Sequence, residues 1–130
     1  MPARRALVVD DSESIRRQVV AALASVPNLA CTEAGDGAAG IRAATSAAFD
    51  IVVTDLNMPL VGGLGLVTWL RGRAETRAVP IVVLTTVGDE ENRRRLLAAG
   101  ATAYLTKPVD APQLVAKVAE LLAAGQAKAG

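Results

Sequence analysis

The stretch that decides the fold is Ile51-Val52-Val53-Thr54-Asp55, a run with strong strand preference that ends in a carboxylate. Because it lacks polar alternation, it is typical of a strand buried on both faces of a parallel sheet. Leu56-Asn57-Met58-Pro59 follows, and proline cannot donate to a strand ladder, so the strand is expected to end at Asp55. Ligands bind at this end of strands in open α/β sheets, although a single Asp here could equally cap a turn.

The composition fits one domain with an aliphatic core. The chain has 130 residues, of which 52% are apolar and 2% aromatic. The net charge of +1 gives no basic field for nucleic acid. The single cysteine, Cys31, excludes an internal disulfide and favours a reducing, cytoplasmic location. The chain has no histidine, which excludes Ser-His and Cys-His nucleophile pairs and histidine zinc sites. We expect no membrane span, since the apolar run after Arg5 stops at Asp10.

Four further segments resemble 51–55 in their content of apolar and strand-forming residues, and each is expected to be a strand: 6–9, 29–34, 81–84 and 103–106. Helical patterns lie between and after them: from a cap at Ser12 or a close neighbour to about Pro27, over 38–46, after Gly62-Gly63, from Asp89-Glu90 to Gly100, and after a cap at Asp110. Five strands alternating with five helices predict a doubly wound parallel sheet. We expect one domain over residues 1–124 and a flexible tail at 125–130.

Reactive side chains follow four of the predicted strands. Asp10 and Asp11 follow the first strand, Asp55 ends the third, Thr85 the fourth, and Lys107 follows the fifth. The carboxyl ends of parallel strands share one edge, so three carboxylates, a hydroxyl and an ammonium should meet there. Clustered carboxylates repel unless a cation lies among them, and oxygen ligands suit Mg²⁺. Such a site could stabilise a transferring phosphoryl group while the middle carboxylate attacks it.

Four motifs in order carry a family resemblance: Val8-Val9-Asp10-Asp11, Thr54-Asp55-Leu56-Asn57-Met58-Pro59, Leu84-Thr85-Thr86 and Tyr104-Leu105-Thr106-Lys107-Pro108. Their order and spacing resemble the receiver domains of two-component response regulators, of the stand-alone chemotaxis (CheY-like) type, over residues 6 to 124. The resemblance implies a flavodoxin-like α/β fold with the strand order 2-1-3-4-5 and five helices.

The resemblance also implies a role for each site residue. Asp55 would accept a phosphoryl group from a histidine kinase or a histidine phosphotransfer protein, in a reaction that needs Mg²⁺ or Mn²⁺. The implied metal ligands are Asp10, Asp11, Asp55 and Asn57. The implied phosphate-contacting and switch residues are Thr85, Thr86, Tyr104 and Lys107. The bond before Pro108 is expected to be cis.

The implied output is a change in the surface formed by the fourth helix, fifth strand and fifth helix, which would bind an unknown output protein. Such a chain would be a monomer or a weak phosphorylation-dependent dimer, and no enzyme beyond its own phosphorylation and dephosphorylation. A phosphorelay intermediate stays open. So does a haloacid-dehalogenase-like phosphatase, although that family has an Asp where Asn57 stands. A flavodoxin-like carrier is disfavoured because Asp10 and Asp11 would repel a flavin phosphate.

Overall fold

The computed structural model describes residues 4–58, 60–86 and 90–129, with side chains described as far as Gly125. Over these residues the chain alternates strands with helices. The strands are β1 (Arg4–Val9), β2 (Leu29–Ala34), β3 (Ile51–Asp55), β4 (Ile81–Thr85) and β5 (Ala103–Thr106). The helices are α1 (Glu13–Leu23), α2 (Gly37–Ser46), α3 (Gly63–Arg71), α4 (Glu90–Ala99) and α5 (Ala111–Ala129).

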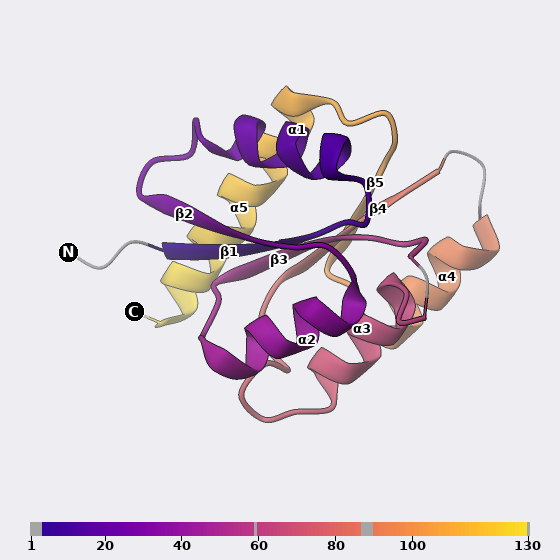
Figure 1. Ribbon diagram of the computed structural model, residues 1–130. Coiled ribbons are helices and arrows are strands. Elements are labelled where there is room, and N and C mark those ends of the chain that lie inside the picture. Colours follow the sequence, from indigo (N-terminus) through magenta and orange to yellow (C-terminus); the bar gives the residue numbers. More distant parts are fainter. Residues whose placement is uncertain (1–3, 59, 87–89, 130) are drawn as a thin grey trace.

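The five strands form one parallel sheet in the order β2-β1-β3-β4-β5, which confirms the predicted fold. Strand β3 lies in the middle, paired with β1 on one side and β4 on the other. Helices α1 and α5 cover one face of the sheet, and α2, α3 and α4 cover the other (Figure 1). All strands run the same way, so their carboxyl ends lie at a single edge.

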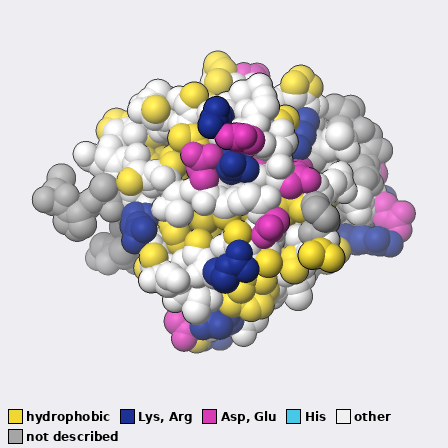
Figure 2. Space-filling view, viewed as in Figure 1, with side chains coloured by type: hydrophobic (Ala, Val, Ile, Leu, Met, Phe, Trp, Pro, Cys, Tyr) yellow, Lys and Arg dark blue, Asp and Glu magenta, His cyan; other side chains and the backbone are white. Residues whose placement is uncertain are grey.

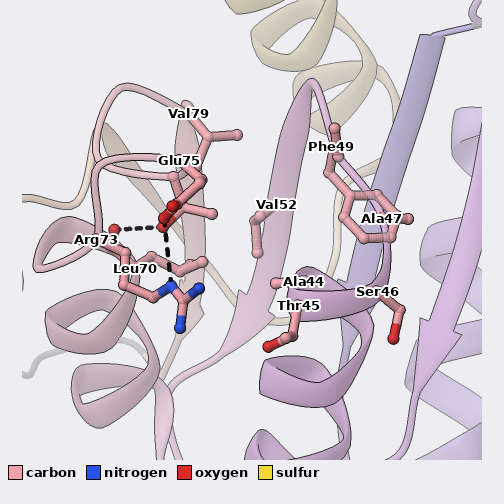
Figure 3. Close-up of a pocket in the computed structure, with 12 residues that line it drawn as sticks. Ala44, Thr45, Ser46, Ala47, Phe49, Val52, Leu70, Arg73, Glu75 and Val79 are labelled. Carbon is pink, nitrogen blue, oxygen red and sulfur yellow. Dashed lines mark hydrogen bonds and ion pairs between the residues drawn. The ribbon is translucent and has the colours of Figure 1, made fainter.

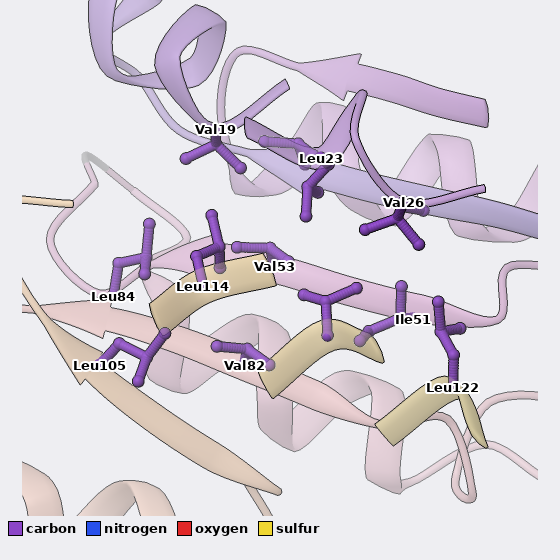
Figure 4. Close-up of a cluster of buried hydrophobic side chains, with 13 residues drawn as sticks. Val19, Leu23, Val26, Ile51, Val53, Val82, Leu84, Leu105, Leu114 and Leu122 are labelled. Atoms are coloured by element: carbon purple, nitrogen blue, oxygen red, sulfur yellow. The ribbon is translucent and has the colours of Figure 1, made fainter. Parts of the chain in front are cut away.

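Alternate residues of the central strands supply two separate cores. Ile51 and Val53 point toward α1 and α5 and pack with Leu23 and Leu114 (Figure 4). Val52 points the other way, into the cluster formed with α3 and α4. All five residues of β3 are buried, so the prediction of a strand covered on both faces is confirmed.

Side-chain caps begin several helices at the loops that follow the strands. Ser12 caps α1 by accepting a hydrogen bond from the Ile15 amide at 3.3 Å, as predicted. Asp36 caps α2 by accepting one from the Ala39 amide at 2.7 Å. Asp110 precedes α5, and its Oδ1 lies 3.5 Å from the Gln113 amide nitrogen. These caps hold the first turns of α1 and α2 close to the carboxyl edge of the sheet.

Helix α5 continues to Ala129, through residues 125–129 where the composition predicts a tail. Strand β1 begins at Arg4, because its amide donates to the Asn28 carbonyl at 2.8 Å. Pro59, expected to follow the end of β3, and Asp89, expected at the start of α4, lie outside the described residues.

A guanidinium near the opposite, amino-terminal edge of β4 and β5 connects the end of α3 with two loops. Arg71, at the end of α3, donates from Nε to the Gly100 carbonyl at 2.8 Å and from Nη1 to the Val79 carbonyl at 2.7 Å. Its Nη2 lies 3.2 Å from Thr102 Oγ1. Burial lowers the pKa of Arg71. Its partners in the described residues are neutral oxygens, so its removal leaves several partly buried acceptors without donors.

We expect Arg71→Met to lower the free energy of unfolding by about 3 kcal/mol, because loss of buried hydrogen-bond partners costs about 1–3 kcal/mol for each group left unpaired. The measurement is urea unfolding followed by circular dichroism. Arg77→Met is the matched control, since Arg77 is exposed in the same loop region, and its effect should stay within about 0.5 kcal/mol. Equal effects of the two substitutions would contradict the structural role of Arg71.

Candidate functional site

The carboxyl edge of the sheet brings three aspartates together. Asp10 follows β1 and is 1% exposed, and Asp55 ends β3 and is 4% exposed. Asp11 is exposed at the start of the same loop as Asp10. One carboxylate oxygen from each residue lies within 4.8 Å of the other two. Because adjacent parallel strands place these residues side by side, the cluster follows from the fold and needs no unusual loop.

Lys107 provides the positive charge of this cluster. Its Nζ lies 2.7 Å from Asp55 Oδ1 and 3.7 Å from Asp10 Oδ2, and its side chain is 20% exposed. The backbone fixes its place, since the Lys107 amide donates to the Thr85 carbonyl at 2.7 Å. The bond between Lys107 and Pro108 is cis. One ammonium against three carboxylates leaves an excess of negative charge at the edge when all three are ionised.

The surroundings of Asp10 leave one of its two carboxylate oxygens without a hydrogen-bond donor. Its Oδ1 accepts a hydrogen bond from the Ser12 amide at 2.8 Å. Its Oδ2 is buried and accepts no hydrogen bond from the described residues. Burial raises the pKa of Asp10, as do Asp55 and Asp11, while the Ser12 amide and Lys107 act in the opposite direction. Lys107 Nζ, at 3.7 Å, is too far away to donate a hydrogen bond to this oxygen. A buried carboxylate oxygen without a donor is destabilising, and direct ligation of a metal cation would remove that cost.

The donor set fits a hard divalent cation. The three carboxylates offer oxygen ligands, which Mg²⁺ and Mn²⁺ prefer, and neither histidine nor cysteine stands among them. Asn57 lies two residues after Asp55 in the same loop, and its side chain is exposed. The loop is held close to the site at Gly63, where a Cβ atom would overlap the Asp55 carbonyl. The Gly63 amide donates to the Leu56 carbonyl at 2.8 Å.

The predicted switch residues Thr85 and Tyr104 lie on β4 and β5, and Thr86 follows β4. Thr85 is 3% exposed, and its Oγ1 is buried without a hydrogen-bond partner among the described residues. Thr86 is exposed at the edge. Tyr104 is half-buried on β5, where it is the register partner of Val83 on β4. Thr85 therefore holds an unused hydroxyl next to the strand that carries the tyrosine.

Arg93 contacts the predicted switch tyrosine, a contact that could not be predicted from the sequence. Its guanidinium carbon lies 5.0 Å from the centroid of the Tyr104 ring, a cation–π distance. Its Nη1 also pairs with Glu90 Oε2 at 3.1 Å. The run of three arginines on α4 indicates only a solvated helix face, and no sequence signal connects it with a tyrosine eleven residues later. The structure thus places a cation over the predicted switch aromatic.

A separate pocket of about 330 Å³ lies at the opposite ends of β3 and β4 (Figure 3). Val52 and Leu70 line it, with the end of α2 on one side and the loop after α3 on the other. Its charged lining residues, Arg73 and Glu75, face each other at 3.6 Å. The acidic cluster does not line this pocket, so the two sites are separate.

The face of the molecule drawn in Figure 2 shows no dominant field of one sign. Acidic and basic side chains are interspersed over the face drawn in Figure 2, in keeping with the net charge of +1. In the part of the chain that the structure describes, no helix combines the length and apolarity that a membrane crossing requires.

The chain matches a known protein family over most of its length. A protein-family model, that of the response regulator receiver domain, matches residues 6–119. The chain is 36% identical over 116 residues to the phosphate regulon transcriptional regulatory protein PhoB of Klebsiella pneumoniae, an alignment that covers 89% of this chain and 50% of PhoB. It is 38% identical over 118 residues to the transcriptional regulatory protein PrrA of Mycobacterium tuberculosis, which covers 91% of this chain and 49% of PrrA. The chain thus spans about half the length of these curated relatives.

A solved structure matches over a larger share of its own length. The chemotaxis response regulator CheY4 of Vibrio cholerae superposes with a TM-score of 0.84 at 32% sequence identity. The match covers 92% of this chain and 98% of the CheY4 chain.

Proposed function

This chain belongs to the response regulator receiver domain family of two-component signalling proteins, and from that premise we propose that it accepts a phosphoryl group on Asp55. The donor would be a phosphohistidine of a histidine kinase or a histidine phosphotransfer protein. The observation that carries the proposal is the setting of Asp55: a buried carboxylate at the end of the central strand, 2.7 Å from Lys107 Nζ and beside two further aspartates.

The transfer is a displacement at phosphorus. An oxygen of the Asp55 carboxylate attacks, the bond between phosphorus and the donor imidazole nitrogen breaks, and its electron pair stays on that nitrogen. The product is an acyl phosphate on Asp55. Lys107 would donate to a phosphoryl oxygen and offset its charge, because its ammonium already lies against the attacking carboxylate. The chain would catalyse only this step and the later hydrolysis.

A divalent cation held by Asp10, Asp11, Asp55 and Asn57 would add electrostatic stabilisation of the phosphoryl oxygens. Thr85 supplies a further donor. Its buried Oγ1 has no partner among the described residues, so a hydrogen bond to a phosphoryl oxygen would satisfy a group that is otherwise unpaired.

We further propose that the signal leaves through the output face, defined as the surface of α4, β5 and α5 that includes Glu91, Arg94, Arg95, Tyr104 and Lys117. If Thr85 turns toward the phosphoryl group, the space that it leaves becomes available to the Tyr104 ring. A tyrosine has an apolar body and a polar tip, so two ring positions can lie close in free energy. Phosphorylation would shift their populations only by its different interaction with each. The similarity to the chemotaxis response regulator CheY4 supports a signalling output for this chain.

The test uses beryllofluoride, a mimic of the phosphoryl group, with Mg²⁺ and amide NMR spectra. We expect one equivalent to bind, with shifts at Asp55 and Thr85 and at Glu91, Tyr104 and Lys117 on the output face. In Thr85→Ala the site should still bind, while the shifts on the output face fall to less than about half, because the connecting hydroxyl is gone.

Thr106→Ala is the matched control, since Thr106 is exposed and is the register partner of Thr85 on β5. It should keep the wild-type response. Unchanged shifts on the output face in Thr85→Ala would refute the coupling. If no beryllofluoride bound, the receiver function would be wrong, and a yellow purified protein or turnover of a chromogenic phosphate ester would favour the flavodoxin-like or phosphatase hypothesis.

A further inference from the structure

Arg16 on α1 reaches the loop that carries two of the three clustered aspartates. Its Nη1 donates to the main-chain carbonyl of Asp10 at 2.8 Å. Its Nε donates to Glu33 Oε1 on β2, also at 2.8 Å. The arginine side chain is only 17% exposed, whereas that of Glu33 is 42% exposed. One planar guanidinium thus joins α1, the end of β1 and the edge strand β2.

The hydrogen bond from Arg16 matters because of where the Asp10 carbonyl lies. The β1 ladder ends at Val9, the register partner of both Ala34 and Thr54, so the Asp10 carbonyl lies beyond the strand pairs. This carbonyl belongs to the same planar peptide unit as the Asp11 amide. A hydrogen bond that fixes the Asp10 oxygen therefore also fixes the direction in which the Asp11 residue leaves the sheet.

Asp11 needs such support more than its neighbours do. Asp10 is held by the Ser12 amide at 2.8 Å, and Asp55 by Lys107 at 2.7 Å. Within residues 4–58, 60–86 and 90–129, by contrast, no side chain or amide donates to the Asp11 carboxylate. Its carboxylate can be placed among the other two only through its backbone.

We propose that Arg16 is a positioning residue of the acidic site: with Glu33 as its anchor, it orients the peptide between Asp10 and Asp11 and so places the Asp11 carboxylate for a divalent cation. The inference rests on the proposed function, because that function supplies the cation. The role is geometric and not one of charge, since Glu33 balances the guanidinium and Arg16 donates to a neutral carbonyl.

Arg16→Lys separates geometry from charge. A lysine keeps the positive charge, but its single ammonium cannot reproduce two donors in a fixed plane. Calorimetric titration with Mg²⁺, well below the melting temperature, should show an affinity about tenfold lower, the lower end of the effect of outer-shell partners on metal sites. Arg17→Lys is the matched control: Arg17 lies next to Arg16 but pairs with Glu13 on the exposed face of α1, 73% exposed. Its Mg²⁺ affinity should equal that of the wild type within twofold.

Glu33→Gln is a second test that distinguishes an effect of geometry from an effect of charge. It removes a negative charge near the site but keeps an oxygen that can accept from Arg16 Nε. If geometry decides, its Mg²⁺ affinity should change less than that of Arg16→Lys. If Arg16→Lys binds Mg²⁺ as the wild type does while Glu33→Gln does not, charge decides and the proposal is wrong.

A metal-free measurement keeps this proposal distinct from the proposed function. In the absence of Mg²⁺, Arg16→Lys should shift the Asp11 amide resonance, whereas Arg17→Lys should leave it unchanged. If the wild type does not bind Mg²⁺, the metal-dependent function fails, and the amide resonance still decides whether Arg16 orients the peptide. An unchanged Asp11 resonance in Arg16→Lys overturns the proposal, even if the variant melts at a lower temperature.

Discussion

Asp55→Asn is expected to reduce phosphorylation of this chain to the background level. The substitution keeps the size of the side chain and its place at the end of β3, but an amide oxygen does not form the acyl phosphate that the carboxylate forms. Asp55 is the aspartate that Lys107 approaches most closely, at 2.7 Å against 3.7 Å for Asp10, and it lies on the central strand. The measurement is transfer of radioactive phosphate from acetyl phosphate or a phosphorylated histidine kinase, followed on a denaturing gel.

Asp50→Asn provides the matched control for this experiment. Asp50 precedes the same strand at its other end, is exposed, and accepts a hydrogen bond from the Arg5 amide at 2.8 Å. It should be labelled at the wild-type rate. Labelling of Asp55→Asn at that rate would show that another residue accepts the phosphoryl group, and mass spectrometry of the labelled peptide would identify it.

The fold could be predicted because its strands have clear local signals. Segments 29–34, 51–55 and 103–106 form strands with the predicted bounds, each limited by turn residues or by proline. The start of β1 could not be predicted, since Arg4 joins the sheet through pairing with Leu29, a long-range contact. Helix α5 runs on to Ala129, where the composition predicts a tail; small residues are typical of both, and alanine has the highest helix propensity.

For the site, too, some residues could be predicted from the sequence and others could not. The rule that parallel strands end at one edge was enough to bring Asp10, Asp11 and Asp55 together with Lys107. The sequence does not show that Arg16 holds a main-chain carbonyl, because any residue could provide that acceptor. A role that depends on the chemistry of a side chain at a strand end, as for Asp55, can be predicted from the sequence. A role that depends on which backbone carbonyl a long side chain reaches, as for Arg16, can be recognised only in the structure.

Removal of divalent cations is expected to stop labelling by acetyl phosphate, and Asp11→Ala should have nearly the same effect at millimolar Mg²⁺. Three carboxylates with one ammonium among them leave a negative site, which would repel an incoming phosphoryl group. The Asp11 side chain is exposed and contributes one of the oxygens in the cluster, so its loss weakens the cation site without creating a cavity. The measurement is the labelling rate as a function of Mg²⁺ concentration, with EDTA as the zero point.

The stability of Asp11→Ala distinguishes loss of the cation site from loss of the fold. Without Mg²⁺, removing one of three mutually repelling carboxylates should leave the melting temperature equal to or above that of the wild type. With Mg²⁺, the wild type should gain stability by mass action, and the variant should gain less. Glu13→Ala, two residues away on the exposed surface of α1, should resemble the wild type in labelling and in its response to Mg²⁺. Undiminished labelling in EDTA would remove the cation from the mechanism, and the charge of the transferred group would then have to be balanced by Lys107 alone.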